Sequence, residues 1–90
     1  MARAGRRQIK DATTADVVKN TGIGKQRLYY LEQKGFIQPR RVAVGEKEFR
    51  YYSALDVEKV RAIKRRLDRG LRYRPAMQQA LAEVERHRSR

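Results

Sequence analysis

The segment from Gly24 to Gly35 carries side chains well suited to bind a polyanion. It combines amides, phenols and cations, which are the groups that hydrogen-bond base edges and phosphate oxygens in nucleic acids. Leu28 and Leu31 fix the buried direction of a helix over residues 24–34, because successive helical residues turn by about 100°. The exposed sides of that helix then present the candidate contacts Lys25, Gln26, Arg27, Tyr29, Tyr30 and Gln33.

Two adjacent tyrosines lie on this predicted surface. Tyr29 and Tyr30 both point away from the leucines on the helical wheel, so Tyr29 is expected to contact the ligand. For Tyr30 two alternatives stay open. Its hydroxyl contacts a phosphate, or its ring packs under a following hairpin or against the third predicted helix.

The net charge supports a nucleic-acid partner. The chain has 90 residues and a formal charge of +13, and such an excess of cations favours a polyanion because neutralised phosphates release condensed counterions. An anionic membrane is disfavoured, since the basic residues are not gathered on one face of a long amphipathic helix and no apolar run approaches about 20 residues. With no secretory signal and no cysteine, a cytoplasmic, nucleoid-associated protein is expected.

Turn and cap residues divide the chain into a basic flexible arm over 1–12 and one domain over 13–88. Thr13 and Asp16 predict the start of a helix that runs to about Asn20 and stops at Gly22. The helix over 24–34 follows and ends at Gly35, which suits a left-handed C-terminal cap. Phe36 and Ile37 are expected to plug the core.

A hairpin is predicted over residues 40–52, where β-branched and aromatic residues flank a glycine turn. Its cations are the predicted phosphate contacts Arg40, Arg41, Lys47 and Arg50. Ser53 caps a third helix that ends near Arg69 and stops at Gly70, and a fourth helix runs from Pro75 to about Arg88. The apolar stripe of the fourth helix is predicted to be Met77, Ala80, Leu81 and Val84.

No feature of the sequence predicts an enzyme, a metal site or a cofactor. The 10 carboxylates are scattered, and neither a nucleophile beside a histidine nor a glycine-rich phosphate loop is found. The single histidine, His87, is a poor basis for a metal site in a chain without cysteine. Glu32 is instead expected to pair with a basic residue of the hairpin. The seven basic residues Arg61, Lys64, Arg65, Arg66, Arg69, Arg72 and Arg74 form either a solvated face or a secondary phosphate track.

The order of these motifs resembles the N-terminal DNA-binding domain of the MerR family of bacterial transcriptional regulators, over residues 13 to about 85. The first two helices match through Thr14, Ala15, Asp16, Val17, Val18, Gly22, Ile23, Gly24, Leu28, Tyr29, Tyr30, Leu31 and Glu32. The match continues through residues 35–40 and 49–57, and then through Ile63, Lys64 and Gly70.

The resemblance implies a mainly α, winged helix-turn-helix fold with about four helices and a small two-stranded hairpin as the wing. It implies that the helix over 24–34 enters the major groove of double-stranded DNA while the wing grips the flanking backbone. Gln26 falls on a groove contact, Tyr30 on a phosphate contact and Arg50 on the wing arginine. Thr14 also joins the candidate DNA-binding residues. For Tyr52, packing under the wing and DNA contact are open alternatives.

Two departures from the family pattern limit what the resemblance transfers. Tyr29 replaces an arginine and Leu31 a tyrosine, so the target sequence cannot be taken over. The sequence also lacks the long dimerisation helix and effector segment of typical members, which predicts either a minimal, free-standing form or the DNA-binding part of a longer protein. Its oligomeric state, a cooperative assembly on DNA or a dimer, is open.

A transcriptional regulator, with RNA polymerase as a possible partner, is the first functional hypothesis. An architectural or recombination accessory protein, similar to phage excisionases or small terminase subunits, is the second hypothesis. A basic RNA-binding protein is the third, and it rests on charge alone.

Overall fold

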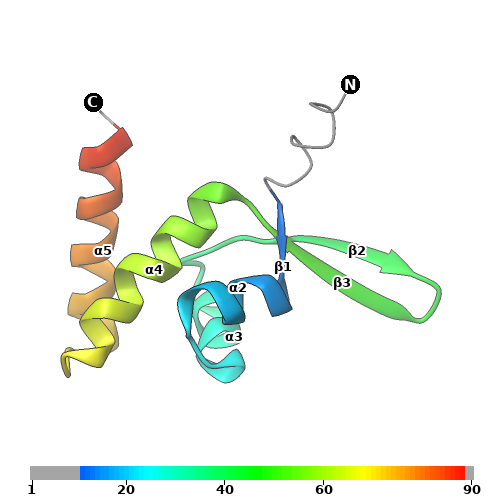
Figure 1. Cartoon of the computed structure of the whole chain (residues 1–90), viewed down its shortest axis with the longest axis horizontal. Helices are drawn as coiled ribbons and strands as arrows, with labels where there is room; N and C mark the ends of the chain where they lie inside the picture. The colour runs from blue at the N-terminus through cyan, green and yellow to red at the C-terminus, as the bar shows by residue number, and fades with distance from the viewer. Residues whose placement is uncertain (1–10, 89–90) are drawn as a thin grey trace.

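The computed structural model describes residues 11–88, so the predicted basic arm lies outside the described residues except for Asp11 and Ala12. The described part of the chain contains four helices and a small antiparallel sheet, which confirms the predicted winged helix-turn-helix fold (Figure 1). In chain order the elements are β1 (Ala12–Thr13), α2 (Thr14–Thr21), α3 (Lys25–Gln33), β2 (Arg40–Val44), β3 (Lys47–Tyr52), α4 (Ala54–Asp68) and α5 (Tyr73–Arg88).

The helix-turn-helix is bounded by local hydrogen bonds that the sequence predicts. The Thr13 side chain accepts a hydrogen bond from the Asp16 backbone N–H at 3.2 Å, and the Asp16 carboxylate accepts one from the Thr13 N–H at 3.1 Å. This reciprocal capping box satisfies two donors at the start of α2. Gly22, with a φ of 81°, then turns the chain toward α3.

The wing is the hairpin of β2 and β3, residues 40–52. Its register runs from Arg40 opposite Tyr51 to Val44 opposite Lys47, and Gly45 supplies the positive φ of 65° that the tight turn requires. The structure adds a third strand to the two that were predicted. β1 pairs with the other side of β3, so the sheet order is β1-β3-β2. A strand of two residues has no alternating pattern that could reveal it.

The second half of the chain forms a helical pair. The Ser53 side chain accepts a hydrogen bond from the Asp56 N–H at 3.1 Å and starts α4, as predicted. α5 begins at Tyr73, two residues before the predicted start, with Pro75 still in the first turn, where its missing N–H costs nothing. In Figure 1, α5 and the wing stand at opposite ends of the molecule, with α4 and the helix-turn-helix between them.

One hydrophobic core joins all four helices and the sheet. It confirms the buried direction predicted for α3 from Leu28 and Leu31, and the predicted burial of Phe36 and Ile37. The predicted stripe of α5 is wrong at one position, because Leu81 is 37% exposed and Ala76 is buried instead. Buried core residues are Val17, Ile23, Leu28, Leu31, Phe36, Ile37, Tyr52, Val60, Ala62, Ile63, Ala76, Ala80 and Val84. Among the described helices, none is long and apolar enough to cross a membrane.

Candidate nucleic-acid interface

The polar side of α3 faces solvent, as the helical wheel predicts. Leu28 and Leu31 are fully buried, and the four polar residues Lys25, Gln26, Arg27 and Gln33 are all exposed. Gly24 begins the helix without a side-chain cap. The first backbone N–H groups of an α-helix have no intrahelical acceptor, and no capping side chain accepts from them in α3. They add partial positive charge at this end of the helix. The exposed side of α3 offers hydrogen-bond donors and acceptors of the kind that bind base edges.

The two tyrosines of α3 have different surroundings. Tyr29 is 37% exposed, and the Arg50 guanidinium lies 4.7 Å from the centroid of its ring. Tyr30 is half-buried, and its ring centroid lies 4.5 Å from that of Tyr73 in α5. The predicted alternative partners of Tyr30 were the hairpin and the third helix. The structure instead places the Tyr30 ring against the fourth helix, because α5 starts early enough to include Tyr73.

The cations of the wing divide over the two faces of the hairpin, since side chains alternate along a strand. Arg41 and Arg50 are directly opposite each other on the face that meets α3. Arg40 and Lys47 project from the other face. Arg40 pairs with Asp11 at 2.9 Å, and its guanidinium lies 5.2 Å from the ring centroid of Tyr51. The four predicted phosphate contacts of the wing therefore lie on one hairpin, but on its two opposite faces.

Glu32 joins α3 to the wing. Arg50 Nε donates to Glu32 Oε1 at 2.9 Å, while Arg41 donates to Glu32 Oε2 from Nε at 3.0 Å and also from Nη2. The carboxylate hydrogen bond raises the pKa of Arg41 further above its ordinary value. The Glu32 side chain is 10% exposed. The predicted pairing of Glu32 with a basic wing residue is confirmed, and it involves two arginines.

Tyr52 does not belong to the exposed interface. It is 0% exposed, and its hydroxyl oxygen accepts a hydrogen bond from Thr14 Oγ1 at 3.5 Å. Burial raises the pKa of Tyr52. Of the two alternatives for this residue, its full burial favours packing under the wing, and direct contact with DNA stays a prediction. Thr14 is half-buried beside it, with its hydroxyl directed at Tyr52.

Most basic residues of α4 have partners within the fold. Arg61 donates to the Asn20 side chain, Lys64 pairs with Asp68, and both Arg65 and Arg66 pair with Glu83 in α5. These contacts favour a structural role for that part of the predicted phosphate track. The exposed cations Arg69, Arg72 and Arg74 lie around the connection between α4 and α5. Arg74 shares a shallow hollow with Tyr30 and Lys34, so this connection adjoins the end of α3.

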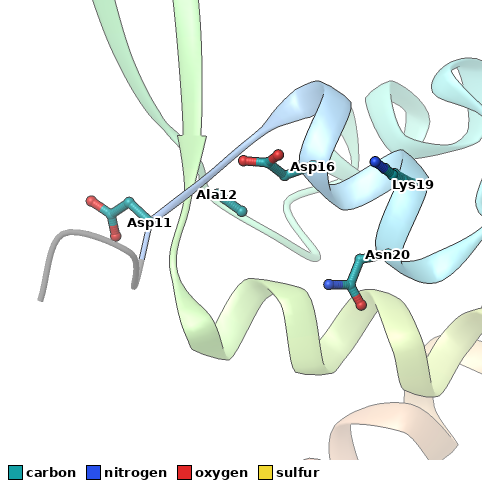
Figure 2. Close-up of a pocket in the computed structure, with 5 residues that line it drawn as sticks. All are labelled: Asp11, Ala12, Asp16, Lys19 and Asn20. Carbon is teal, nitrogen blue, oxygen red and sulfur yellow. The ribbon is translucent and has the colours of Figure 1, made fainter. Parts of the chain in front are cut away.

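A second hollow lies on the side of β1 and α2, lined by Asp11, Ala12, Asp16, Lys19 and Asn20 (Figure 2). Both of its carboxylates are already engaged, Asp11 by Arg40 and Asp16 by the cap of α2. Within residues 11–88, no cluster of three or more histidine, cysteine or acidic side chains could hold a metal ion. The remaining candidate surface consists of the exposed polar side of α3 and the face of the wing that meets it.

The second helix of the helix-turn-helix buries its leucines and exposes its polar side, and a basic hairpin lies beside it. This arrangement defines a winged helix-turn-helix protein. The model of the MerR HTH family regulatory protein matches residues 12–78. The chain therefore belongs to the MerR family and is a DNA-binding regulator of that type. Among the curated proteins, none matches the chain.

Proposed function

We propose that this protein binds double-stranded DNA sequence-specifically and regulates transcription, with α3 in the major groove and the wing on the flanking backbone. The observation that carries the proposal is the linkage of the exposed side of α3 to two wing arginines through one carboxylate. A groove-sized helix and a cationic hairpin fixed beside it can meet a base edge and a neighbouring phosphate at the same time.

Base recognition rests on Lys25, Gln26, Arg27 and Gln33 in this proposal. Glutamine amides suit the donor and acceptor pair of adenine, and arginine or lysine suits the two acceptors of guanine. All four side chains are exposed on α3, so none has to leave the core to enter a groove.

Phosphate binding rests on Arg40, Arg41, Lys47, Arg50 and the hydroxyl of Tyr29, with Tyr30 at the edge of the surface. Six such contacts predict a slope of about −5 for the logarithm of the binding constant against the logarithm of salt concentration. Arg40 and Lys47 lie on the wing face away from α3, so they would reach phosphates that Arg41 and Arg50 do not.

The two roles predict different consequences of mutation. Gln26→Ala should change the preferred duplex and cost about 1 to 3 kcal/mol on the original one, because it removes a base contact. Arg50→Ala should weaken binding to every duplex about equally. The measurement is titration of both variants against a duplex selected from a random pool and against a scrambled duplex. Equal losses of both variants on both duplexes would contradict this division of roles.

The family match favours a regulator over the accessory-protein alternative. In this proposal the regulator acts with RNA polymerase on the bacterial nucleoid. A run-off transcription assay on a template bearing the selected site tests this part of the proposal. Competition between duplex DNA and structured RNA at one salt concentration tests the RNA-binding alternative.

A further inference from the structure

We infer that Glu32 is a positioning residue that sets DNA specificity: it holds Arg41 and Arg50 in register with α3 and limits the positive charge that they offer to any phosphate. This inference rests on the proposed function. It assigns to an acid, within a protein of charge +13, a role in choosing between duplexes.

The contacts of Glu32 use both carboxylate oxygens. Arg50 takes Oε1 and Arg41 takes Oε2, so neither guanidinium shares an acceptor with the other. Arg50 is also held from another side by the Tyr29 ring, and its side chain is 24% exposed. Hydrogen bonds between ions of opposite charge are stronger than neutral ones and fix the direction of the guanidinium plane. The two arginines are therefore pre-oriented before DNA arrives.

Glu32 is the residue through which α3 makes its polar contacts with the wing. In the described chain, every hydrogen bond and ion pair between α3 and the wing ends on this residue. The base of the wing is held by β1 and by the buried Tyr52, whereas its tip residues Val44, Phe49 and Lys47 are exposed. Loss of the carboxylate would free the Arg41 and Arg50 side chains to meet the backbone at other distances from α3.

The charge of Glu32 limits binding that is independent of sequence. Two arginines and one carboxylate carry a net charge of +1, whereas the arginines alone carry +2. Non-specific affinity arises from such charges, and specific affinity requires base and phosphate contacts in one register. Removing the acid should strengthen non-specific binding and weaken the discrimination between duplexes.

Glu32→Gln tests the inference, with Glu46→Gln as the matched control. Both changes remove one negative charge, but Glu46 lies in the hairpin turn between β2 and β3, away from α3. We expect Glu32→Gln to bind a scrambled duplex about three to ten times more tightly and to steepen the salt slope by about 1. The ratio of specific to scrambled affinity should fall about tenfold. Glu46→Gln should leave that ratio within about twofold of the wild type.

A double variant keeps the test valid if Glu32→Gln loosens the fold. Arg41→Gln should reduce the magnitude of the salt slope more in the Glu32→Gln background than in the wild type, because Glu32 no longer neutralises Arg41 there. Thermal unfolding of each variant establishes the temperature at which binding is measured. Equal effects of Arg41→Gln in both backgrounds, or equal ratios for Glu32→Gln and Glu46→Gln, would overturn the inference. A wild type without sequence preference would instead overturn the proposed function.

Discussion

Tyr30 and Tyr52 acquire their surroundings from residues far away in the sequence. A helical wheel places Tyr30 away from Leu28 and Leu31, but it cannot show that Tyr73 packs against the ring from α5. Tyr52 ends a strand whose first three positions are exposed, and it packs beside β1 and Thr14. The ion pair of Glu32 with the wing was predictable, because an acid on a helix beside a cationic hairpin gains from pairing. Its contact with a second arginine follows only from the strand register, which places Arg41 opposite Arg50.

At the scale of single residues, Tyr52→Phe separates a core role from a DNA contact. The change removes the hydroxyl that accepts from Thr14 and keeps the buried ring. The free energy of unfolding should fall by about 0.5 to 1.5 kcal/mol, because one hydrogen bond is lost from the interior. The dissociation constant for DNA should stay within about twofold of the wild type. Chemical denaturation and duplex titration check the two values. Weaker DNA binding at unchanged stability would instead indicate that the Tyr52 hydroxyl contacts DNA.

The helices and the wing were predictable to within one or two residues, because their ends are set by local chemistry. Thr13, Ser53 and the glycines that follow α2, α3 and α4 satisfy or terminate the backbone within four residues of sequence. β1 and the first turn of α5 were missed for the opposite reason. Both are stabilised by tertiary pairing, β1 with β3 and Tyr73 with Tyr30, which no local pattern records.

At the scale of elements, the pair of α4 and α5 is predicted to lose stability in acid through Glu83. Although partial burial opposes its ionisation, hydrogen bonds from Arg66 and Arg65 lower the pKa of Glu83 below 4.5. An acid with a lowered pKa stabilises the fold above its ordinary pKa, and this stabilisation is lost as pH falls through the lowered value.

Glu83→Gln should therefore reduce the free energy of unfolding by about 1 to 3 kcal/mol at pH 7, because it removes hydrogen bonds to charged groups. The difference between the variant and the wild type should shrink as pH falls through the lowered pKa of Glu83. Thermal unfolding at a series of pH values measures this. Glu58→Gln, at an exposed position of α4, is the control for loss of a negative charge. A difference that stays constant with pH would contradict the role of Glu83.

The candidate DNA surface of the whole molecule consists of α3, in the middle, and the wing, at one end. The Cα positions extend 41 × 36 × 20 Å, and the wing and α5 stand at opposite ends of the view in Figure 1. The longest dimension is close to one turn of B-DNA, which is about 34 to 36 Å or 10 to 10.5 base pairs. One copy can thus cover little more than one helical turn.

This size predicts the footprint on a selected duplex. One copy should protect about 10 to 12 base pairs from hydroxyl radicals, with protection strongest where α3 and the wing meet successive stretches of backbone.

Two copies on an inverted repeat should bind half-sites whose centres are separated by about one helical turn or a multiple of it, because only then do both α3 helices face the same side of the duplex. Native mass measurement of the same complex counts the copies. A mass of one protein per duplex together with protection over two full turns would contradict the arrangement of α3 and wing proposed above. Insertion of five base pairs between half-sites is the control, since it rotates one site by about half a turn and should abolish cooperative binding while leaving each single-site affinity unchanged.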